Sequence, residues 1–382
     1  MWQRKSILAL LSLGMLATSL GAQDNNLNKL LQKMTKDAAQ TAAPCVVQIE
    51  TRGGADIIVA GAKGQTIRKA LGPTTGVIVS EDGYIITSAF NFINNPNTII
   101  VQIPGKGEMV AQRVATDKSR MLTLIKVDAK GLPVPRVVPR KELMEGQWAI
   151  ALGRALETNV NRSPSICVGT ISALGRVWGK ALQSDAKISP MNYGGPLVDI
   201  QGRVQGIIIP ASPKGEDEIS GFEWYDSGIG FAIPMEDVMT VLPRLKQGKD
   251  LQKGLLGVAM KSPDIYSVAP EIGTIQKGSS AEKAGLKVGD VIVEIDGKPV
   301  ERMAQVQHIL GVKYDGDKIA VKYRRGGEIA EIKSLELTGK NVIVAQPFLG
   351  ILPMRDDPKL GVEVRYVFEK SPAEKIGLKP GD

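Results

Sequence analysis

The sequence predicts a mostly β protein that contains a pair of β-barrels followed by a smaller unit that is repeated. Between residues 44 and 240, short apolar runs alternate with turn signals, and no long helix interrupts them. The chain has 382 residues, with 42 glycines and 22 prolines, which is enough for two or three loop-rich domains. A pattern near residue 256 recurs near residue 349, which indicates that the C-terminal unit is repeated.

Composition and charge narrow the classes of protein to consider. Apolar residues make up 43% of the chain, so it can bury sizeable cores. The net charge is +8, but the basic residues are scattered, and the tightest group, Lys322, Arg324 and Arg325, is typical of a solvated hairpin tip. We therefore expect no nucleic-acid partner, and no motif indicates a metal or another cofactor.

The N-terminus has the features of an export signal. Arg4 and Lys5 precede an apolar run over residues 7–20, and Gly21-Ala22 forms a cleavage edge. We expect a signal peptide over residues 1–22, with an uncleaved anchor as the minor alternative. The mature protein is then periplasmic or extracellular, with no membrane span after signal cleavage.

Two cysteines, Cys45 and Cys167, could pair in an oxidising compartment, but the sequence does not place them within bonding distance. We expect both to be structural, because the barrel region offers no base that would activate a thiol.

The segment at 23–43 contains apolar residues at helical spacing, which predicts an amphipathic helix. They are Leu27, Leu30, Leu31 and Met34.

One stretch, residues 184–210, carries the most specific motif of the chain. Its glycines and prolines form a tight bend, and two apolar runs joined by a Gln-Gly-Arg turn follow it. The stretch resembles the nucleophile loop of trypsin-like serine proteases of the HtrA/DegP family, whose pattern is Gly-Asn-Ser-Gly-Gly-Pro-Leu. Tyr193 stands where the family has its nucleophilic serine, and Met191 replaces the first glycine. The matching positions are Asn192, Gly194, Gly195, Pro196 and Leu197.

Further motifs extend this resemblance over residues 44–240, which implies a trypsin-like double β-barrel. The run at 83–87 resembles the strand before the family's catalytic histidine, which falls on Phe90. The run at 117–127 resembles the strand that carries the catalytic aspartate, which falls on Met121. The degenerate positions are therefore Phe90, Met121 and Tyr193 for the triad and Met191 for the oxyanion hole.

These residues are not suited to trypsin-type catalysis, which needs a hydroxyl nucleophile, an imidazole base and an orienting carboxylate. Phenylalanine and methionine are apolar, and a tyrosine phenol has an unperturbed pKa of about 10. The single histidine, His308, lies outside the barrel region. A Ser–Lys dyad from Ser184, Lys187 and Ser189 is the remaining candidate, but a surface loop accounts for that stretch better.

A second region, residues 254–340, follows a linker over 241–253 and resembles a PDZ domain. Its Gly-Leu-Leu-Gly-Val run is similar to the loop whose backbone N–H groups capture the C-terminal carboxylate of a peptide. We expect residues 305–311 to form the helix beside the peptide groove, with His308 on its groove side or in the core. The expected peptide-binding residues are Leu255, Leu256, Gly257 and Val258.

The PDZ-like pattern begins again at Leu349-Gly350-Ile351 and runs to Asp382. We expect residues 341–382 to form a partial second PDZ domain. A fragment of a longer protein explains this better than a unit that cannot close its core.

The resemblance implies an exported HtrA-like pseudoprotease whose PDZ modules bind peptide C-termini or unfolded exported proteins. It would act as a holdase, a scaffold or a regulator of protein quality control. An active serine-type endopeptidase with a rearranged site is the alternative. In the family the N-terminal segment supports trimers, so a homotrimer or a partnership with an active HtrA paralogue is expected. A helix packed only on its own domain is an equal alternative for that segment.

Overall fold

The computed structural model describes residues 26–54, 58–60, 66–68, 73–155, 158–211, 228–339, 349–354 and 362–382. The expected signal peptide at 1–22 lies outside these residues. None of the described helices combines the length and the apolar character that crossing a bilayer requires.

The first β-barrel closes in the strand order β1-β4-β5-β8-β7-β6, with every neighbouring pair antiparallel. Alternate side chains point inward, so Val47, Ile49 and Ile85 are completely buried in its interior. Its strands are β1 (Val46–Arg52), β4 (Thr74–Ile78), β5 (Tyr84–Ser88), β6 (Thr98–Ile103), β7 (Gly107–Asp117) and β8 (Leu122–Val127). A separate hairpin pairs β2 (Ile58–Ala60) with β3 (Thr66–Arg68).

The second barrel has the order β10-β11-β14-β13-β12-β9, again with antiparallel neighbours. Its strands are β9 (Trp148–Gly153), β10 (Ser165–Gly175), β11 (Ala181–Ser184), β12 (Pro196–Val198), β13 (Val204–Ile209) and β14 (Gly230–Pro234). The expected trypsin-like double barrel is confirmed. Short 3₁₀ helices connect parts of this domain: η1 (Ala43–Cys45), η2 (Ala89–Phe92) and η3 (Arg140–Glu142).

Two helices pack on the junction of the barrels. The helix at 26–42 buries Ala38, Ala39 and Ala42 in the same core cluster as Val238 and Leu245 of α3 (Met235–Leu245). Because α3 continues past residue 240, only residues 246–253 of the expected linker are irregular.

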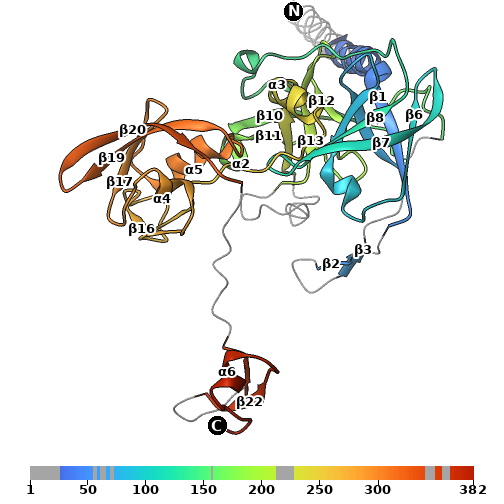
Figure 1. The fold of residues 1–382 in the computed structure, drawn as a ribbon. Coiled ribbons are helices and arrows are strands. Elements are labelled where there is room, and N and C mark those ends of the chain that lie inside the picture. Colours follow the sequence, from blue (N-terminus) through green and yellow to red (C-terminus); the bar gives the residue numbers. More distant parts are fainter. Residues whose placement is uncertain are drawn as a thin grey trace, which may run out of the picture.

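The C-terminal domain lies beside the second barrel (Figure 1). Its sheets are β15-β16 and β18-β17-β19-β20. Helices α4 and α5 complete the domain around a single apolar cluster. The expected groove helix is two residues longer than predicted. The elements are β15 (Val258–Met260), β16 (Ile272–Ile275), α4 (Ser280–Lys283), β17 (Val291–Ile295), β18 (Lys298–Pro299), α5 (Met303–Gly311), β19 (Lys318–Arg325) and β20 (Glu328–Glu336).

The last unit, described over residues 349–354 and 362–382, repeats the local geometry of the preceding domain, whose elements run from β15 to β20. Phe368 N–H donates to the carbonyl of Gly350 at 2.9 Å, as Gln276 N–H does to that of Gly257 at 2.9 Å. The Ser371 side chain begins α6 by accepting from the N–H of Glu374 at 3.1 Å. The elements are β21 (Ile351–Pro353), β22 (Val364–Val367) and α6 (Pro372–Lys375).

The side chain of Tyr314, in the domain that contains β15 to β20, contacts residues of the barrel domain. Its ring lies between two guanidinium groups, with the Cζ atoms of Arg120 and Arg244 at 4.8 and 4.9 Å from its centroid. Its hydroxyl donates to the carboxylate of Asp117 and accepts from Arg120. Burial raises the pKa of Asp117 to about 6, although Arg120 and backbone N–H groups oppose the shift. The two domains therefore share a buried polar cluster.

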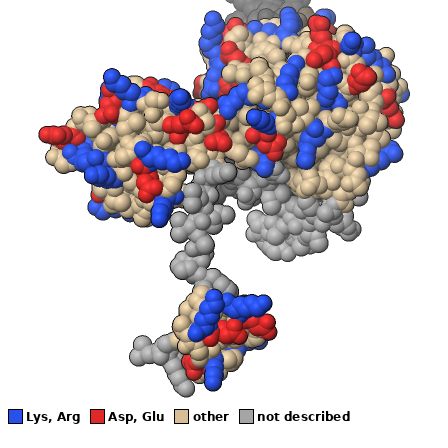
Figure 2. Space-filling view, viewed as in Figure 1, with Lys and Arg blue, Asp and Glu red and all other residues tan. Residues whose placement is uncertain are grey.

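A second contact joins the domains nearby, where α2 (Arg176–Gly179) packs against α5 (Figure 1). The approach is close: a Cβ added at Gly311 would lie 2.0 Å from the carbonyl oxygen of Trp178. Acidic and basic side chains are interspersed over the face of both domains shown in Figure 2. That face therefore presents no single positive patch of the kind that a nucleic acid requires.

Candidate functional site

The turn that corresponds to the nucleophile loop belongs to the second barrel, between β11 and β12, and lies against the first barrel. The side chain of Asn192 holds it by accepting from Ser189 N–H at 2.8 Å and donating to the Lys187 carbonyl at 3.3 Å. Gly194 has a φ of +87°, and an added Cβ would lie 2.1 Å from Oγ1 of Thr87 in the first barrel. This position therefore accepts only glycine.

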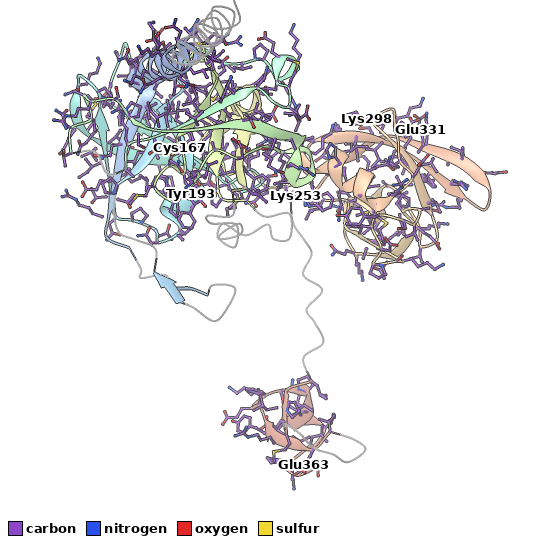
Figure 3. The ribbon with its side chains drawn as sticks, turned by 180° about the vertical axis from the view of Figure 1, so that it is seen from behind. Cys167, Tyr193, Lys253, Lys298, Glu331 and Glu363 are labelled. Atoms are coloured by element: carbon purple, nitrogen blue, oxygen red, sulfur yellow. The ribbon has the colours of Figure 1, made fainter. Side chains whose placement is uncertain are left out.

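Phe90 and Tyr193 meet inside this junction. Their ring centroids are 5.5 Å apart and the planes are inclined by 81°, an edge-to-face pair. Both side chains are 3% exposed and belong to the core cluster of the second barrel, although Phe90 comes from η2 of the first. Asn91 anchors the turn by donating to the carbonyl of Tyr193 at 3.1 Å. Figure 3 shows Tyr193 inside the barrel domain.

Met121 does not share that cluster. It is buried with the residues between the barrels and the helices that cover them. Its carbonyl accepts from Ala89 N–H at 2.7 Å, and its φ is +58°. The structure therefore brings Phe90 and Tyr193 together but places the third triad position in a neighbouring cluster.

His308 lies far from Tyr193 in the fold. It is an exposed residue of α5 that faces α2, where a Cβ added at Gly175 would lie 3.2 Å from its ring. The expectation that His308 lies on the groove side or in the core is therefore wrong, because α2 occupies that flank of the helix. No imidazole is available at the turn.

Met191, at the position of the family's oxyanion-hole glycine, also lacks the backbone geometry that a glycine permits there. Met191 is 43% exposed, has no left-handed φ, and its carbonyl accepts from the hydroxyl of Thr75 at 3.2 Å.

The structure gives no support to the alternative of a catalytic Ser–Lys dyad. Ser184 is buried and its hydroxyl accepts from Ala186 N–H at 3.1 Å, whereas Lys187 is exposed.

The thiol of Cys45 is also unsuited to nucleophilic chemistry. Cys45 and Cys167 are both free, and burial raises the pKa of Cys45 to about 11. Cys167 lies at the edge of the Phe90–Tyr193 cluster. Within the described residues, no group of three His, Cys, Asp or Glu residues could hold a metal ion.

A groove of about 160 Å³ lies between the Gly254–Val258 loop and α5 of the C-terminal domain. All four expected peptide-binding residues line it, together with side chains of α5. Lys253 lines the same groove, and Figure 3 places it near the junction with the barrels. The remaining lining residues are Gly254, Met260, Gln276, Met303, Val306, Gln307 and Leu310.

The loop has backbone donors available for an anion. Within the described part of the chain, the N–H groups of Leu256 and Gly257 have no acceptor. The N–H of Leu255 is not free, because it donates to the carbonyl of Thr338 at 2.9 Å. Leu255 therefore contributes to the wall of the groove and not to the set of donors.

Two residues that sequence reasoning missed are Tyr314 and Gln307. Nothing near Tyr314 in the sequence indicates that its partners lie in another domain. Gln307 falls in the expected groove helix, and helical spacing from Leu310 and Met303 was the available signal.

Comparisons with known proteins agree with this geometry. The trypsin-like peptidase domain family matches residues 74–207, and the PDZ domain family matches residues 271–325. A probable periplasmic serine endoprotease, DegP-like, from Pseudomonas fluorescens is 30% identical over 84% of this chain and 71% of its own. The chain belongs to the HtrA/DegP family.

Other HtrA/DegP relatives show the same extent of similarity. A DegP-like protein of Chlamydia trachomatis is 31% identical over 80% of this chain and 65% of its own. The crystal structure of the serine endoprotease from Yersinia pestis is 26% identical, with a TM-score of 0.58, and covers 80% of this chain and 98% of its own. The HtrA-type protease AlgW with tripeptide is 25% identical, with a TM-score of 0.60, and covers 80% and 96%.

Proposed function

We propose that this HtrA/DegP chain is an exported pseudoprotease that binds polypeptide C-termini or unfolded proteins through PDZ1, its first PDZ domain. The observation that carries the proposal is the packing of Phe90 against Tyr193, at positions where the family has a base and a nucleophile. Without imidazole, carboxylate or serine at these places, proton transfer and acyl transfer have no groups to perform them.

The groove supports the binding part of the proposal. It combines an apolar lining with two uncommitted backbone N–H groups, which suits a carboxylate followed by an added strand. The related AlgW structure, with a tripeptide, supports a peptide as the ligand. We extend the proposal to a role as holdase, scaffold or partner of an active paralogue, and to domain limits of 44–240 for the barrels and 254–340 for PDZ1.

An active endopeptidase is the second candidate, because the relatives are named serine endoproteases. Casein hydrolysis by the full chain, beside a Tyr193→Phe variant, separates the two. We expect no turnover from either protein, with titratable binding of unfolded casein by both. Turnover by the wild type alone would assign the chemistry to Tyr193 and refute the proposal. Equal turnover by the wild type and by Tyr193→Phe would mean that another residue is the nucleophile.

A homotrimer is part of the proposal. Leu27 and Leu30 are 55% and 52% exposed on the helix at 26–42. Beside them, an apolar hollow of about 150 Å³ is lined by Met34, Trp148 and Val168, among others. An apolar patch of this kind suits a second copy of the chain. Light scattering should give a trimer that Leu30→Glu dissociates and that Lys29→Glu, an exposed control, leaves intact. A monomeric wild type would contradict this.

Export is proposed from the N-terminal sequence and from the periplasmic naming of the relatives. Mass spectrometry of protein recovered from the periplasm should give Gln23 as the first residue. An intact N-terminus on a soluble cytoplasmic protein would contradict export.

A further inference from the structure

The contact between the barrels and PDZ1 contains a carboxylate that is completely buried. Asp117, the last residue of β7, is 0% exposed. Its Oδ1 accepts from the N–H of Arg120 at 2.9 Å, and its Oδ2 accepts from the hydroxyl of Tyr314. Tyr314 is itself buried, so PDZ1 supplies a direct partner of this carboxylate and shields it from water.

The cations near Asp117 are shared with other acceptors. Nη1 of Arg120 is 4.0 Å from Oδ2 of Asp117, which is too long for a hydrogen bond. The same guanidinium lies 3.8 Å from the carboxylate of Asp237. The Lys180 ammonium donates to the carbonyl of Ser119 at 3.0 Å. Because its counter-ions are shared in this way, the buried carboxylate is costly to ionise.

The remaining charged groups around Asp117 and Arg120 come from η3, α3, the linker and PDZ1. They form ion pairs with one another: Arg140 with Asp237 at 2.6 Å, Arg244 with Asp317 at 3.1 Å, and Lys118 with Asp250 at 3.9 Å. Arg120 and Lys180 favour the ionised form of Asp117, but the loss of water outweighs them and raises its pKa to about 6.

Undocking of PDZ1, that is, its departure from the position that the structure shows, would change this balance. Removal of Tyr314 opens Asp117 to water, which returns its pKa toward the usual 3.8. A protonated carboxyl can accept from the phenol or donate to it, so the docked contact is compatible with the proton. Docking is therefore strongest below about pH 4 and weakens as the pH rises through 6.

We propose that a proton-dependent latch, formed by Asp117, Arg120 and Tyr314, docks PDZ1 on the barrels and loosens as the pH rises. The open state stays a minority, because the contact of α2 with α5 remains. The groove loop moves with the latch. Lys253 forms a β-bridge with Tyr314, and Gly254 N–H donates to the neighbouring carbonyl of Lys313 at 3.0 Å. The latch therefore controls where the groove lies relative to the barrels.

Hydroxyl-radical footprinting of the full chain tests the latch. Tyr314 is 3% exposed when docked, whereas Tyr266 of the same domain is 63% exposed and serves as the internal reference. Mass spectrometry measures the oxidation of both at about pH 5 and about pH 8. We expect the ratio of Tyr314 to Tyr266 oxidation to rise about tenfold, as the two pKa values of Asp117 require. A ratio that stays constant or falls would overturn the inference.

Three variants assign the effect. Asp117→Asn is neutral and can still accept from Arg120 N–H and donate to Tyr314, so the ratio should stay low at both pH values. Asp317→Asn removes another carboxylate from the same contact and should keep the rise. His308→Gln removes the single histidine, which lies at the contact of α2 with α5, and should also keep it. A rise that survives Asp117→Asn, or that disappears in His308→Gln, would overturn the inference.

A second measurement decides the question if Asp117→Asn does not fold. Carboxyl ¹³C NMR of the wild type, labelled at aspartate, should show one signal that titrates near pH 6. If every aspartate signal titrated at its usual lower pH, the inference would be overturned.

Discussion

The barrel junction and the PDZ1 groove each contain a closely packed glycine with positive φ, but the space beside that glycine is filled at the junction and open in the groove. At each, a glycine with positive φ is pressed against a hydroxyl residue: Gly194 against Thr87 and Gly257 against Ser279. At the junction, Phe90 and Tyr193 fill the space beside the turn. In the groove, the adjoining N–H groups stay open and about 160 Å³ remains empty. Each region therefore depends on its own local packing, and each can be changed without the other.

The largest effect should come from restoring polar triad residues at the junction. Phe90→His with Met121→Asp places an imidazole and a carboxylate in two apolar clusters, and we expect the free energy of unfolding to fall by about 4 kcal/mol. Urea denaturation measures it, with Phe90→Leu plus Met121→Leu as the apolar control. An unchanged stability would mean that the junction still tolerates polar groups and has not become a core.

The next effect concerns the turn glycine. Gly194→Ala adds a Cβ 2.1 Å from Oγ1 of Thr87 at positive φ, so we expect a loss of about 3 kcal/mol. Gly107→Ala is the matched control, because Gly107 has a φ of +79° and open space around it. It should cost about 1 kcal/mol. Equal losses would show that φ alone, and not the close approach, fixes the turn.

Between the two regions, Asp117 should make stability depend on pH. Its folded pKa of about 6 exceeds its usual value of 3.8, so the folded chain retains a proton that the unfolded chain releases. This contribution is complete below about pH 4 and is lost as the pH rises past 6, a change of roughly 2 to 3 kcal/mol. The dependence should vanish in Asp117→Asn and persist in Asp128→Asn, an exposed control. If the free energy of unfolding rose between pH 4 and pH 6, the prediction for Asp117 would be contradicted.

The smallest effect is on the groove alone. Gly257→Ala places a Cβ 2.3 Å from that of Ser279 at a φ of +75°, which displaces the loop that carries the donors. Peptide affinity should fall about tenfold, equivalent to about 1.4 kcal/mol. Gly316→Ala, with a φ of +80° in open space, should leave the affinity unchanged. If Gly257→Ala bound peptides normally, the loop would not be the carboxylate site.

Strand alternation and turn glycines predicted the barrels and the turn, because both signals lie in neighbouring residues. The groove was predicted from the resemblance of the Gly-Leu-Leu-Gly-Val run to a PDZ loop. Side-chain partners from distant segments were harder to predict. The resemblance to a PDZ loop put Leu255 among the peptide-binding residues, yet its N–H donates to the carbonyl of Thr338, more than eighty residues later. His308 was expected at the groove or in the core, because helical spacing does not reveal that a short helix from the second barrel covers that flank.

Met121 shows a related limit. Alignment placed it at a triad position, together with Phe90 and Tyr193. Its left-handed backbone and its place in the neighbouring cluster follow from how residues 117–121 turn between β7 and β8. That turn is held by Tyr314 and Arg120, and the first of these is about two hundred residues away in the sequence.

Tyr314 also has a thermodynamic consequence for the molecule as a whole. Its ring is only 3% exposed and belongs to the core that the barrels share with their covering helices. Separating PDZ1 from the barrels would expose that ring and leave Asp117 and Arg120 without its hydroxyl. The barrels and PDZ1 should therefore melt as one calorimetric unit, with a van't Hoff enthalpy close to the heat absorbed by both domains together.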